Sequence, residues 1–321
     1  MKLALIGASQ IAAKILPAIR SCEGIEIVGF GSHDDRHAKT YSAQNQIPFL
    51  GSYDDVFRNQ TVEAVYISNS NIHHGPTILE ALKYGKHVLC EKPLALSERE
   101  AISLFDAASR AKRILLEGLM YRFHPQIVEL KKRVASGDYG KPIKIRANLA
   151  FDYGGVEAIS RRLSTGGGAL PDLGCYLVDF IGSIAGHSSV RAVRVFRENL
   201  GFSAFLAFEN GLLAEIGASM AYPSSNPWEV ICERGALSVL RFNPHGEAES
   251  ELTVINNESE RTVHSISSVH SGLAQFSQEF LNFRDCIQGH AEPFVSADES
   301  VKNAALLERL IAEPNSFDSI P

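Results

Sequence analysis

The stretch LALIGASQIAAKILPAIRS, from Leu3 to Ser21, joins a short apolar run to an amphipathic segment through a glycine turn. The run Leu3–Gly7 is almost continuously hydrophobic, which is typical of a parallel strand covered on both faces. The segment Gln10–Ser21 has apolar residues at helical spacing. A strand that enters a helix through a tight glycine turn favours an open, doubly wound α/β sheet.

The same alternation continues along the N-terminal part of the chain. Four further apolar runs predict strands at Glu26–Gly31, Glu63–Ser68, Lys86–Glu91 and Arg113–Gly118. Helical patterns lie between them, and in His73–Gly85 the final glycine supplies a C-terminal stop. Strands that alternate with helices predict a Rossmann-type domain with a parallel sheet, which we place at residues 1–121.

After residue 122 the pattern changes to consecutive strands. A helix at Pro125–Ser136 leads into runs that alternate in period two, and turn signals in FENGLL and CERGALS predict hairpins. Strands without helices between them indicate an antiparallel sheet, so we expect an α+β domain with an open, mainly antiparallel sheet at residues 122–321. The predicted strands are Ile143–Asp152, Val190–Glu198, Phe202–Asn210, Gly211–Met220, Trp228–Arg241 and Glu251–Asn257, and two late helices are expected near Ala274–Ile287 and Asp298–Ile311.

Length and composition limit the functional class. The chain has 321 residues, too many for one comfortable hydrophobic core, which also predicts two domains. The net charge of −6 argues against a nucleic-acid partner, because such proteins usually carry a basic face. No apolar run reaches the roughly 18 residues that a membrane span needs, so we expect no membrane partner.

The cysteines and the N-terminus both predict a cytoplasmic protein. The five cysteines include no CxxC pair and indicate reduced thiols. The apolar core of the N-terminus is only five residues long and leads directly into the glycine turn, so we interpret it as a strand and not as a signal peptide.

The glycine turn GASQIA has most of the pattern that a dinucleotide fold requires. Gly7 and Ala12 occupy the first and third positions of G-x-G-x-x-G/A, and Ser9 occupies the second. We expect Gly7, Ser9, Gln10 and Ile11 to contact the pyrophosphate at the start of the helix, where the Ser9 hydroxyl could also bond a phosphate. The alternative is an ordinary strand–helix turn.

The end of the second predicted strand, GSHDDRHAK, bears on the choice of cofactor. Ser32 stands where an NAD site usually has a carboxylate, and His33 and Arg36 follow it. A hydroxyl with cationic neighbours suits a 2′-phosphate, so we expect NADP in preference to NAD. Asp34 and Asp35 either repel that phosphate or cap the next helix.

Two other patterns invite a functional interpretation but lack the necessary partners. His33 and His37 have a metal-ligand spacing, but no third ligand is apparent, so we expect surface histidines and no metal site. Cys175 lies beside Tyr176, but nothing next to it resembles a base that would activate a thiolate.

Three segments, taken together, resemble a known family. They are VYISNSNIHHGPTILEALKYGKHVLCEKPLALS, MYRFHPQ and GGGALPDLGCYLVD. In this order they are similar to motifs of the glucose–fructose oxidoreductase / inositol dehydrogenase / rhizopine-catabolism (Gfo/Idh/MocA) family. The resemblance extends over the chain from Lys2 to the last helix. The resemblance implies a nucleotide-binding domain, a substrate-binding open sheet that often builds dimers or tetramers, and NAD(P)-dependent chemistry on sugars, cyclitols or related alcohols.

The resemblance also assigns candidate site residues. Lys92 matches the lysine of the family's EKP motif, and Asp172 and Tyr176 match its D-x-x-x-Y/H pair, although histidine often replaces this tyrosine. The implied cofactor contacts, beyond those of the glycine turn and the second strand, are Ser68, Asn69, Ser70, His74, Glu91, Lys92 and Arg162, and the implied substrate contacts are Lys92, Tyr121, Asp172 and Tyr176.

The same residues make chemical sense without the family. Hydride transfer at an alcohol carbon requires a partner that moves the hydroxyl proton. A tyrosine has a pKa of about 10, and a nearby ammonium group can lower it by roughly one to three units. We therefore expect Tyr176 to act as proton donor or acceptor beside Lys92, which follows the carboxyl end of a parallel strand, where ligands bind. Pro93 fixes the backbone there, and a cis bond is one way to do so.

Each assignment has a structural alternative. Lys92 could be a surface lysine, Tyr176 a tyrosine at the edge of the core, and Asp172 a helix cap. Asp179, three residues after Tyr176, could be either a substrate contact or a solvated residue. At the level of the whole protein, the alternative is a non-catalytic regulator that senses a dinucleotide or a sugar on the same fold.

Overall fold

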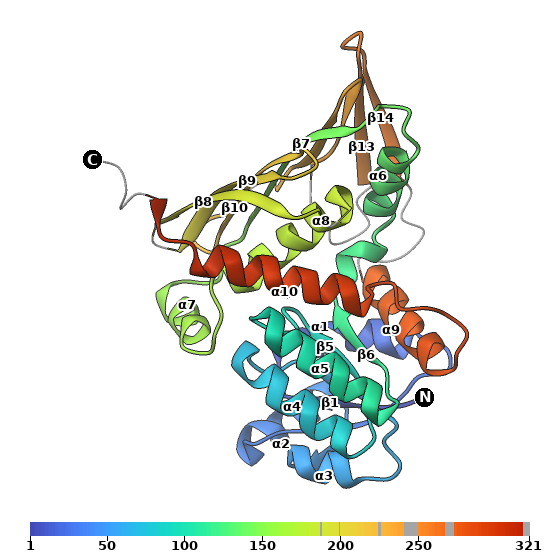
Figure 1. Ribbon diagram of the computed structural model, residues 1–321. Helices are drawn as coiled ribbons and strands as arrows, with labels where there is room; N and C mark the ends of the chain where they lie inside the picture. The colour runs from blue at the N-terminus through green and yellow to red at the C-terminus, as the bar shows by residue number, and fades with distance from the viewer. Residues whose placement is uncertain (187, 199, 224–225, 241–249, 267–272, 317–321) are drawn as a thin grey trace. The chain divides into compact units, whose positions relative to one another are not determined.

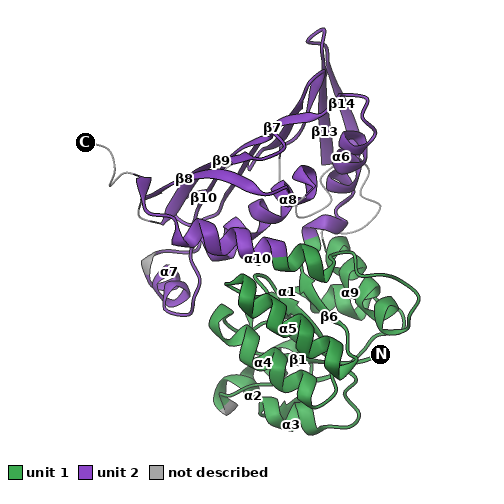
Figure 2. Ribbon diagram, in the orientation of Figure 1, with its two compact units in different colours: residues 1–120, 273–301 green, residues 121–272, 302–321 purple. Residues whose placement is uncertain are grey.

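The computed structural model describes residues 1–186, 188–198, 200–223, 226–240, 250–266 and 273–316 (Figure 1). The chain forms two compact units (Figure 2). Unit 1 contains Met1–Met120 and Leu273–Val301, and unit 2 contains Tyr121–Gly272 and Lys302–Pro321. The chain therefore leaves unit 1 after Met120, returns to it late, and leaves it again after Val301.

Unit 1 is built on a six-stranded parallel sheet with the order β3-β2-β1-β4-β5-β6. This order confirms the predicted doubly wound sheet, since it is the order of the dinucleotide-binding folds. Only β3 was not expected, because three residues are too few to show an apolar period. The strands are β1 Lys2–Ile6, β2 Glu26–Gly31, β3 Phe49–Gly51, β4 Ala64–Ile67, β5 His87–Glu91 and β6 Leu115–Gly118.

Helices connect these strands and cover the sheet. They are α1 Gln10–Arg20, α2 Asp35–Asn45, α3 Tyr53–Arg58, α4 Asn71–Lys83, α5 Glu98–Ala111 and, from late in the sequence, α9 Ala274–Ile287. Helix α4 packs beside α5, and α1 packs beside α9.

The placement of α9 differs from the sequence interpretation, which assigned everything after residue 121 to one domain. Phe280 of α9 packs against the ring of Tyr66 in β4, with ring centroids 5.3 Å apart. Both side chains are fully buried, so α9 forms part of the core of unit 1. A contact between residues this far apart in the sequence leaves no local signal, which is why the pattern of elements did not reveal it.

Unit 2 is built on an eight-stranded sheet with the order β14-β13-β12-β11-β7-β10-β9-β8. Within the described strands, β7 and β10 pair in parallel and the remaining neighbours pair antiparallel, which confirms the predicted α+β class. The strands are β7 Pro142–Ala150, β8 Val190–Glu198, β9 Gly201–Phe208, β10 Leu213–Ser219, β11 Trp228–Cys232, β12 Gly235–Val239, β13 Ser250–Asn256 and β14 Arg261–Ile266.

Both predicted hairpins are present in this sheet. FENGLL turns between β9 and β10, and CERGALS turns between β11 and β12. The run Trp228–Arg241 is therefore two strands, and Arg241 itself lies outside the described residues. Beyond β12 the sheet continues with β13 and β14, and the latter was not predicted.

Helical segments line one face of this sheet. The π-helical segment η2, Ala169–Gly174, packs on β9 and β10, and α8, Cys175–Ala185, packs on β7. The other segments are the 3-10 turn η1 Met120–Phe123, α6 Pro125–Ala135, α7 Val156–Leu163 and α10 Ala297–Ala312, which begins in unit 1 and ends in unit 2. In the part of the chain that the structure describes, no helix is long and apolar enough to cross a membrane.

Candidate active site

The strand order of unit 1 reverses between β1 and β4, and in doubly wound sheets ligands bind at the carboxyl ends of such strands. We call this edge of unit 1 the ligand edge. Gly7 follows β1 there with a φ of 98°, a conformation that side chains rarely adopt. A Cβ on Gly7 would lie 3.4 Å from the backbone nitrogen of Asn69, which follows β4. The glycine thus brings the two turns of the ligand edge close together.

Ser9 ties these two turns to each other. Its hydroxyl accepts a hydrogen bond from the amide of Ala12 at 3.1 Å, which caps α1, and donates to the hydroxyl of Ser68 at 2.8 Å. In this structure the Ser9 hydroxyl is thus engaged with Ala12 and Ser68. Its place in the motif serves helix capping and the contact between β1 and β4.

The backbone amides of the first turn of α1 can bind an anion. Within the described residues, the amides of Gln10 and Ile11 have no hydrogen-bond acceptor, because Ser9 satisfies only that of Ala12. Such amides point out of a helix N-terminus, where the helix dipole favours negative charge. The amides of Gln10 and Ile11 are therefore suitable hydrogen-bond donors for a phosphate group, as the predicted pyrophosphate site requires.

The turn after β2 contains the residues predicted to select the cofactor. Ser32 is buried, and its hydroxyl accepts a hydrogen bond from the amide of Asp34 at 3.2 Å. Asp34 caps α2 by accepting from the amide of His37 at 3.0 Å, and this bond holds the pKa of Asp34 below its usual range. Capping, one of the two alternatives for the acidic pair, is confirmed for Asp34. Arg36 lies in the first turn of α2 with an exposed side chain.

The two histidines of this region have separate environments. The ring of His33 lies against that of Tyr53, with centroids 3.9 Å apart, whereas His37 Nε2 lies 3.3 Å from the carbonyl oxygen of Ala8. Across the described part of the chain, no three His, Cys, Asp or Glu side chains form a group that could hold a metal ion.

His74 connects the turns that follow β4 and β5. Its ring is buried, with Nε2 at 3.2 Å from the carbonyl oxygen of Asn69 and Nδ1 at 2.8 Å from that of Pro93. The peptide bond between Lys92 and Pro93 is cis, as the sequence suggested. The predicted contacts after β4 and the EKP motif after β5 are thereby held together at the ligand edge, while Ser70 bonds His73 at 2.7 Å.

Glu91, just before Lys92, is directed into unit 1. Its carboxylate accepts a hydrogen bond from the hydroxyl of Tyr66 at 2.6 Å. Glu279 of α9 is 3% exposed, and neither of its carboxyl oxygens has a hydrogen-bond partner among the described residues. Burial, together with the negative charge of Glu91, raises the pKa of Glu279 well above its usual value. Burial thus favours the neutral form of the Glu279 carboxyl group in the folded protein.

Replacing Glu279 with glutamine should raise the thermal stability of the protein, and more so at pH 8 than at pH 5. A group whose pKa is raised by folding contributes stability below its ordinary pKa of about 4.3, and this contribution is lost as the pH rises towards the folded value. Glutamine does not ionise, so the melting temperature of the variant minus that of the wild type should increase with pH. Glu26→Gln, which changes an exposed carboxylate of the same unit, is the control, and a difference independent of pH would contradict the assignment.

In unit 2, the structure brings Asp172 and Arg162 together. Asp172 is fully buried and accepts hydrogen bonds from Arg162 Nη2 at 3.0 Å and Arg162 Nε at 3.2 Å, and from the amide of Gly168 at 3.0 Å. A Cβ on Gly167 would lie 2.6 Å from the carboxylate, so this position requires a glycine. Asp172 thus accepts a backbone hydrogen bond at the start of η2 and links η2 to α7 through Arg162.

Tyr176 lies in the first turn of α8 and is 8% exposed. Its ring meets that of Tyr121 edge to face, with centroids 5.8 Å apart and an interplanar angle of 85°. Tyr121 meets Trp228 in the same way at 5.4 Å, and the indole nitrogen of Trp228 donates to the carbonyl oxygen of Asn148 at 3.0 Å. The candidate proton donor therefore lies at the edge of an aromatic cluster, in contact with the ring of Tyr121.

Asp179 is buried in a network of hydrogen bonds. It is 0% exposed, and its carboxylate accepts hydrogen bonds from the Tyr121 hydroxyl, from Arg122 Nε at 2.7 Å and Nη2 at 2.6 Å, and from Asn303 Nδ2 at 2.6 Å. Of its two expected roles, that of a solvated residue was wrong, because the donors come from distant segments, which the sequence around Asp179 does not show.

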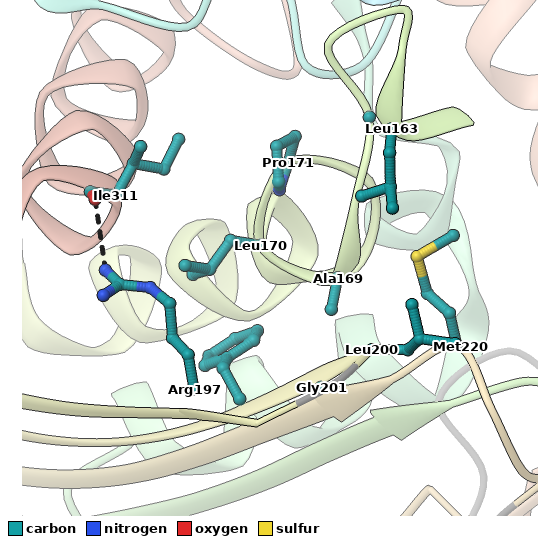
Figure 3. A pocket seen from close by; sticks show the side chains of 11 residues that line it. Leu163, Ala169, Leu170, Pro171, Arg197, Leu200, Gly201, Met220 and Ile311 are labelled. Carbon is teal, nitrogen blue, oxygen red and sulfur yellow. Dashed lines mark hydrogen bonds between the residues drawn. The ribbon is translucent and has the colours of Figure 1, made fainter. Parts of the chain in front are cut away.

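A cavity of about 290 Å³ lies beside η2 within unit 2 (Figure 3). Leu170, Pro171 and Met220 are among the apolar side chains that line it, and Arg197 stands at its edge. The guanidinium of Arg197 donates to the carbonyl oxygens of Leu310, Ile311 and Glu313 at the end of α10, so its hydrogen bonds serve that helix end. The cavity is thus mostly apolar and near the lower size limit of small-molecule sites.

The five cysteines form no disulfide cross-links. All of them lie in the described residues, are buried, and are thiols and not disulfides. Burial raises the pKa of the thiols of Cys22, Cys90, Cys232 and Cys286, which makes them less reactive.

The fold and the ligand edge of unit 1 define a class: a protein with an NAD(P)-binding Rossmann domain joined to a domain built on an open sheet. Comparison with family models agrees. The model for an oxidoreductase family with an NAD-binding Rossmann fold matches residues 1–119, and the model for the GFO/IDH/MocA C-terminal domain matches residues 127–238. The chain belongs to the Gfo/Idh/MocA family of oxidoreductases.

Individual relatives extend over most of the chain. An uncharacterized oxidoreductase of Rhizobium meliloti is 32% identical over 80% of this chain and 79% of its own length. A D-xylose 1-dehydrogenase (NADP(+)) of Haloferax volcanii is 26% identical over 94% of this chain and 93% of its own. Among solved structures, a 3-ketoreductase from Actinomadura kijaniata in complex with NADP and TDP-benzene superimposes with a TM-score of 0.87 at 23% identity, covering 97% of each chain. At that identity the last similarity establishes the fold.

Proposed function

We propose that the chain is an NAD(P)-dependent oxidoreductase that transfers a hydride between nicotinamide and a carbon atom of a sugar, cyclitol or related polyol, or of its carbonyl form. In this proposal unit 1 binds the dinucleotide and unit 2 the substrate. The observation that carries it is the position of Lys92, directly after β5 at the ligand edge and linked through Pro93 and His74 to the turn after β4. Ligands of doubly wound sheets bind at this edge, so the Lys92 ammonium would lie beside a bound ligand.

Bound nicotinamide would supply or accept the hydride, and the residues of the chain would handle the proton. Tyr176 donates the proton to the substrate oxygen, or accepts it, according to the direction of the reaction. The Lys92 ammonium favours the phenolate form of Tyr176, which brings proton transfer closer to neutral pH. Asp172 would bond a substrate hydroxyl or hold Arg162 in place, since it already binds that side chain.

The relatives support the substrate class and the catalytic pair. Their names include a xylose dehydrogenase, a 3-ketoreductase and an aldose-aldose oxidoreductase. Solved structures of the ketoreductase include a lysine variant and a tyrosine variant whose positions are as far apart in sequence as Lys92 and Tyr176.

NADP remains our preferred cofactor. Ser32, directly after β2, stands where an NAD site usually has a carboxylate, Asp34 caps α2, and the exposed Arg36 can approach a 2′-phosphate. The Haloferax relative is named for NADP(+), and the ketoreductase structure contains NADP.

The test is a titration of the wild-type protein with NADH and NADPH, followed by a panel of sugars, cyclitols and polyols assayed at the nicotinamide absorbance. We expect tighter binding of NADPH and turnover with at least one member of the panel. Tight cofactor binding without turnover across the panel would contradict the proposal and favour the alternative, a non-catalytic regulator. Failure to bind either dinucleotide would contradict the proposal and would leave only a regulator that senses a sugar.

We also propose that the protein forms a homodimer or homotetramer through the outer face of the sheet of unit 2. Phe205 and Leu213 are 49% and 47% exposed there, beside a groove of about 470 Å³. Lys144 and Glu215 pair at 2.9 Å on the same face. Exposed apolar side chains rimmed by charges are typical of interaction surfaces. Light scattering should give the molar mass of an oligomer, and a monomeric mass would contradict this.

A further inference from the structure

Asp179 joins three segments of unit 2 at one buried carboxylate. Asp179 lies on α8 less than one turn after Tyr176, so the two residues share a helix face. Both of its oxygens accept two hydrogen bonds: Oδ2 from Tyr121 and Arg122, and Oδ1 from Arg122 and Asn303. A carboxylate has about four acceptor sites, so its capacity is filled within the protein.

The donors come from the segments in which the chain changes units. Tyr121 and Arg122 are the first two residues of unit 2 after its first crossing, and Asn303 is the second residue after the crossing in α10. The side chains are buried, with Arg122 2% and Asn303 7% exposed. Removing one partner from a buried ion pair costs about 3–5 kcal/mol, so this arrangement is held firmly in place.

Tyr121 contacts both Asp179 and Tyr176 and so connects the hydrogen-bond network to the Tyr176 ring. The Tyr121 hydroxyl is fixed on Asp179, and the ring packs against Trp228 on one side and meets Tyr176 edge to face on another. A phenol held at its hydroxyl end and packed along its ring has little freedom to turn. The orientation of the Tyr176 ring, and with it the position of its hydroxyl, therefore depends on how Tyr121 is held.

We propose that Tyr121 is a positioning residue for Tyr176, and that Asp179 holds it in that role. This inference rests on the proposed function, because it assigns Tyr176 the proton transfer. It gives Tyr121 a different role from the predicted substrate contact: its hydroxyl serves Asp179 and its ring serves Tyr176. Misplacing a reacting group by about 1 Å can cost up to about 100-fold in rate, so a small loss of orientation is measurable.

The test is Tyr121→Phe, which keeps the ring and removes its hydrogen bond to Asp179. We expect kcat to fall at least about tenfold while KM and the Kd for the dinucleotide change little, because only the orientation of the proton donor is affected. Rates are expressed per mole of protein that binds dinucleotide, so a loss of folded protein does not mimic the effect. Tyr84→Phe is the matched control, since it removes a 3.1 Å bond from a phenol to Asp54 at the far end of α4.

A double-mutant cycle separates this inference from the proposed function. If Tyr121 acts through Tyr176, Tyr121→Phe should lower kcat in the wild type but have almost no effect in a Tyr176→Phe background. An unchanged kcat for Tyr121→Phe, or an equal loss in both backgrounds, would overturn the positioning role and leave the proposed function intact. Full activity of Tyr176→Phe alone would instead overturn the assignment of the proton transfer to Tyr176, on which this inference rests, and the absence of turnover in the wild type across the panel would overturn the proposed function.

Discussion

Replacing Lys92 with methionine should lower kcat by about two to four orders of magnitude and leave the affinity for the dinucleotide within a few-fold. Methionine keeps most of the length of the side chain but removes the ammonium group. If Tyr176 transfers the proton as proposed, loss of that charge should return its phenol towards the ordinary tyrosine pKa of about 10, where little phenolate exists at neutral pH. General acid–base catalysis contributes about 10²- to 10⁴-fold, and this sets the expected loss.

The control for this variant is Lys83→Met. Lys83 lies at the end of α4, away from the ligand edge, and forms an exposed ion pair with Glu80 at 3.0 Å. Exposed pairs contribute about 0–1 kcal/mol, so we expect normal turnover. If Lys92→Met matched the control in kcat on the substrate identified by the panel, Lys92 would not be a catalytic residue.

Removing the hydroxyl of Tyr176 by the substitution Tyr176→Phe should have an effect of similar size. The ring would keep its edge-to-face packing on Tyr121, so we expect the fold and cofactor binding to be preserved. The proton would have to move to or from water, and kcat should fall by about 10²- to 10⁴-fold. Steady-state kinetics together with a thermal melt separate this loss from one caused by unfolding.

The pH dependence distinguishes a catalytic tyrosine from a structural one. If Tyr176 transfers the proton, the variant should lose the limb of the kcat profile that reports its ionisation. Tyr84→Phe, the same change at a half-buried site at the end of α4, should keep the wild-type profile. A Tyr176→Phe enzyme with wild-type kcat and an unaltered profile would mean that another group moves the proton.

The sequence predicted the two sheets well because their signals are local. Continuous apolar runs marked the parallel strands of unit 1, and period-two runs with glycine turns marked the hairpins of unit 2. The strand β3, with three residues, gave no such signal, and the π-helical segment η2 has a form that apolar spacing does not identify.

The site was only partly predictable, since its contacts join distant segments. Ser9 was recognised as part of the glycine turn, but its bond to Ser68 depends on the pairing of β1 with β4. Asp179 was noticed for its spacing from Tyr176, whereas its donors come from η1 and α10. A short motif specifies a residue type at a position. The role of that residue depends on its hydrogen-bond partners, which only the tertiary structure brings together.

Direct transfer of hydride between nicotinamide and a sugar carbon is the central claim, and isotopic labelling tests it most directly. The enzyme would be incubated with NADPH deuterated at the transferred C4 position and the carbonyl form of the substrate found in the panel, and the product analysed by mass spectrometry. We expect one deuterium on the carbon that becomes the alcohol. An unlabelled product, formed as fast as with unlabelled NADPH, would contradict the account, because the hydride would then have come from a source other than the nicotinamide.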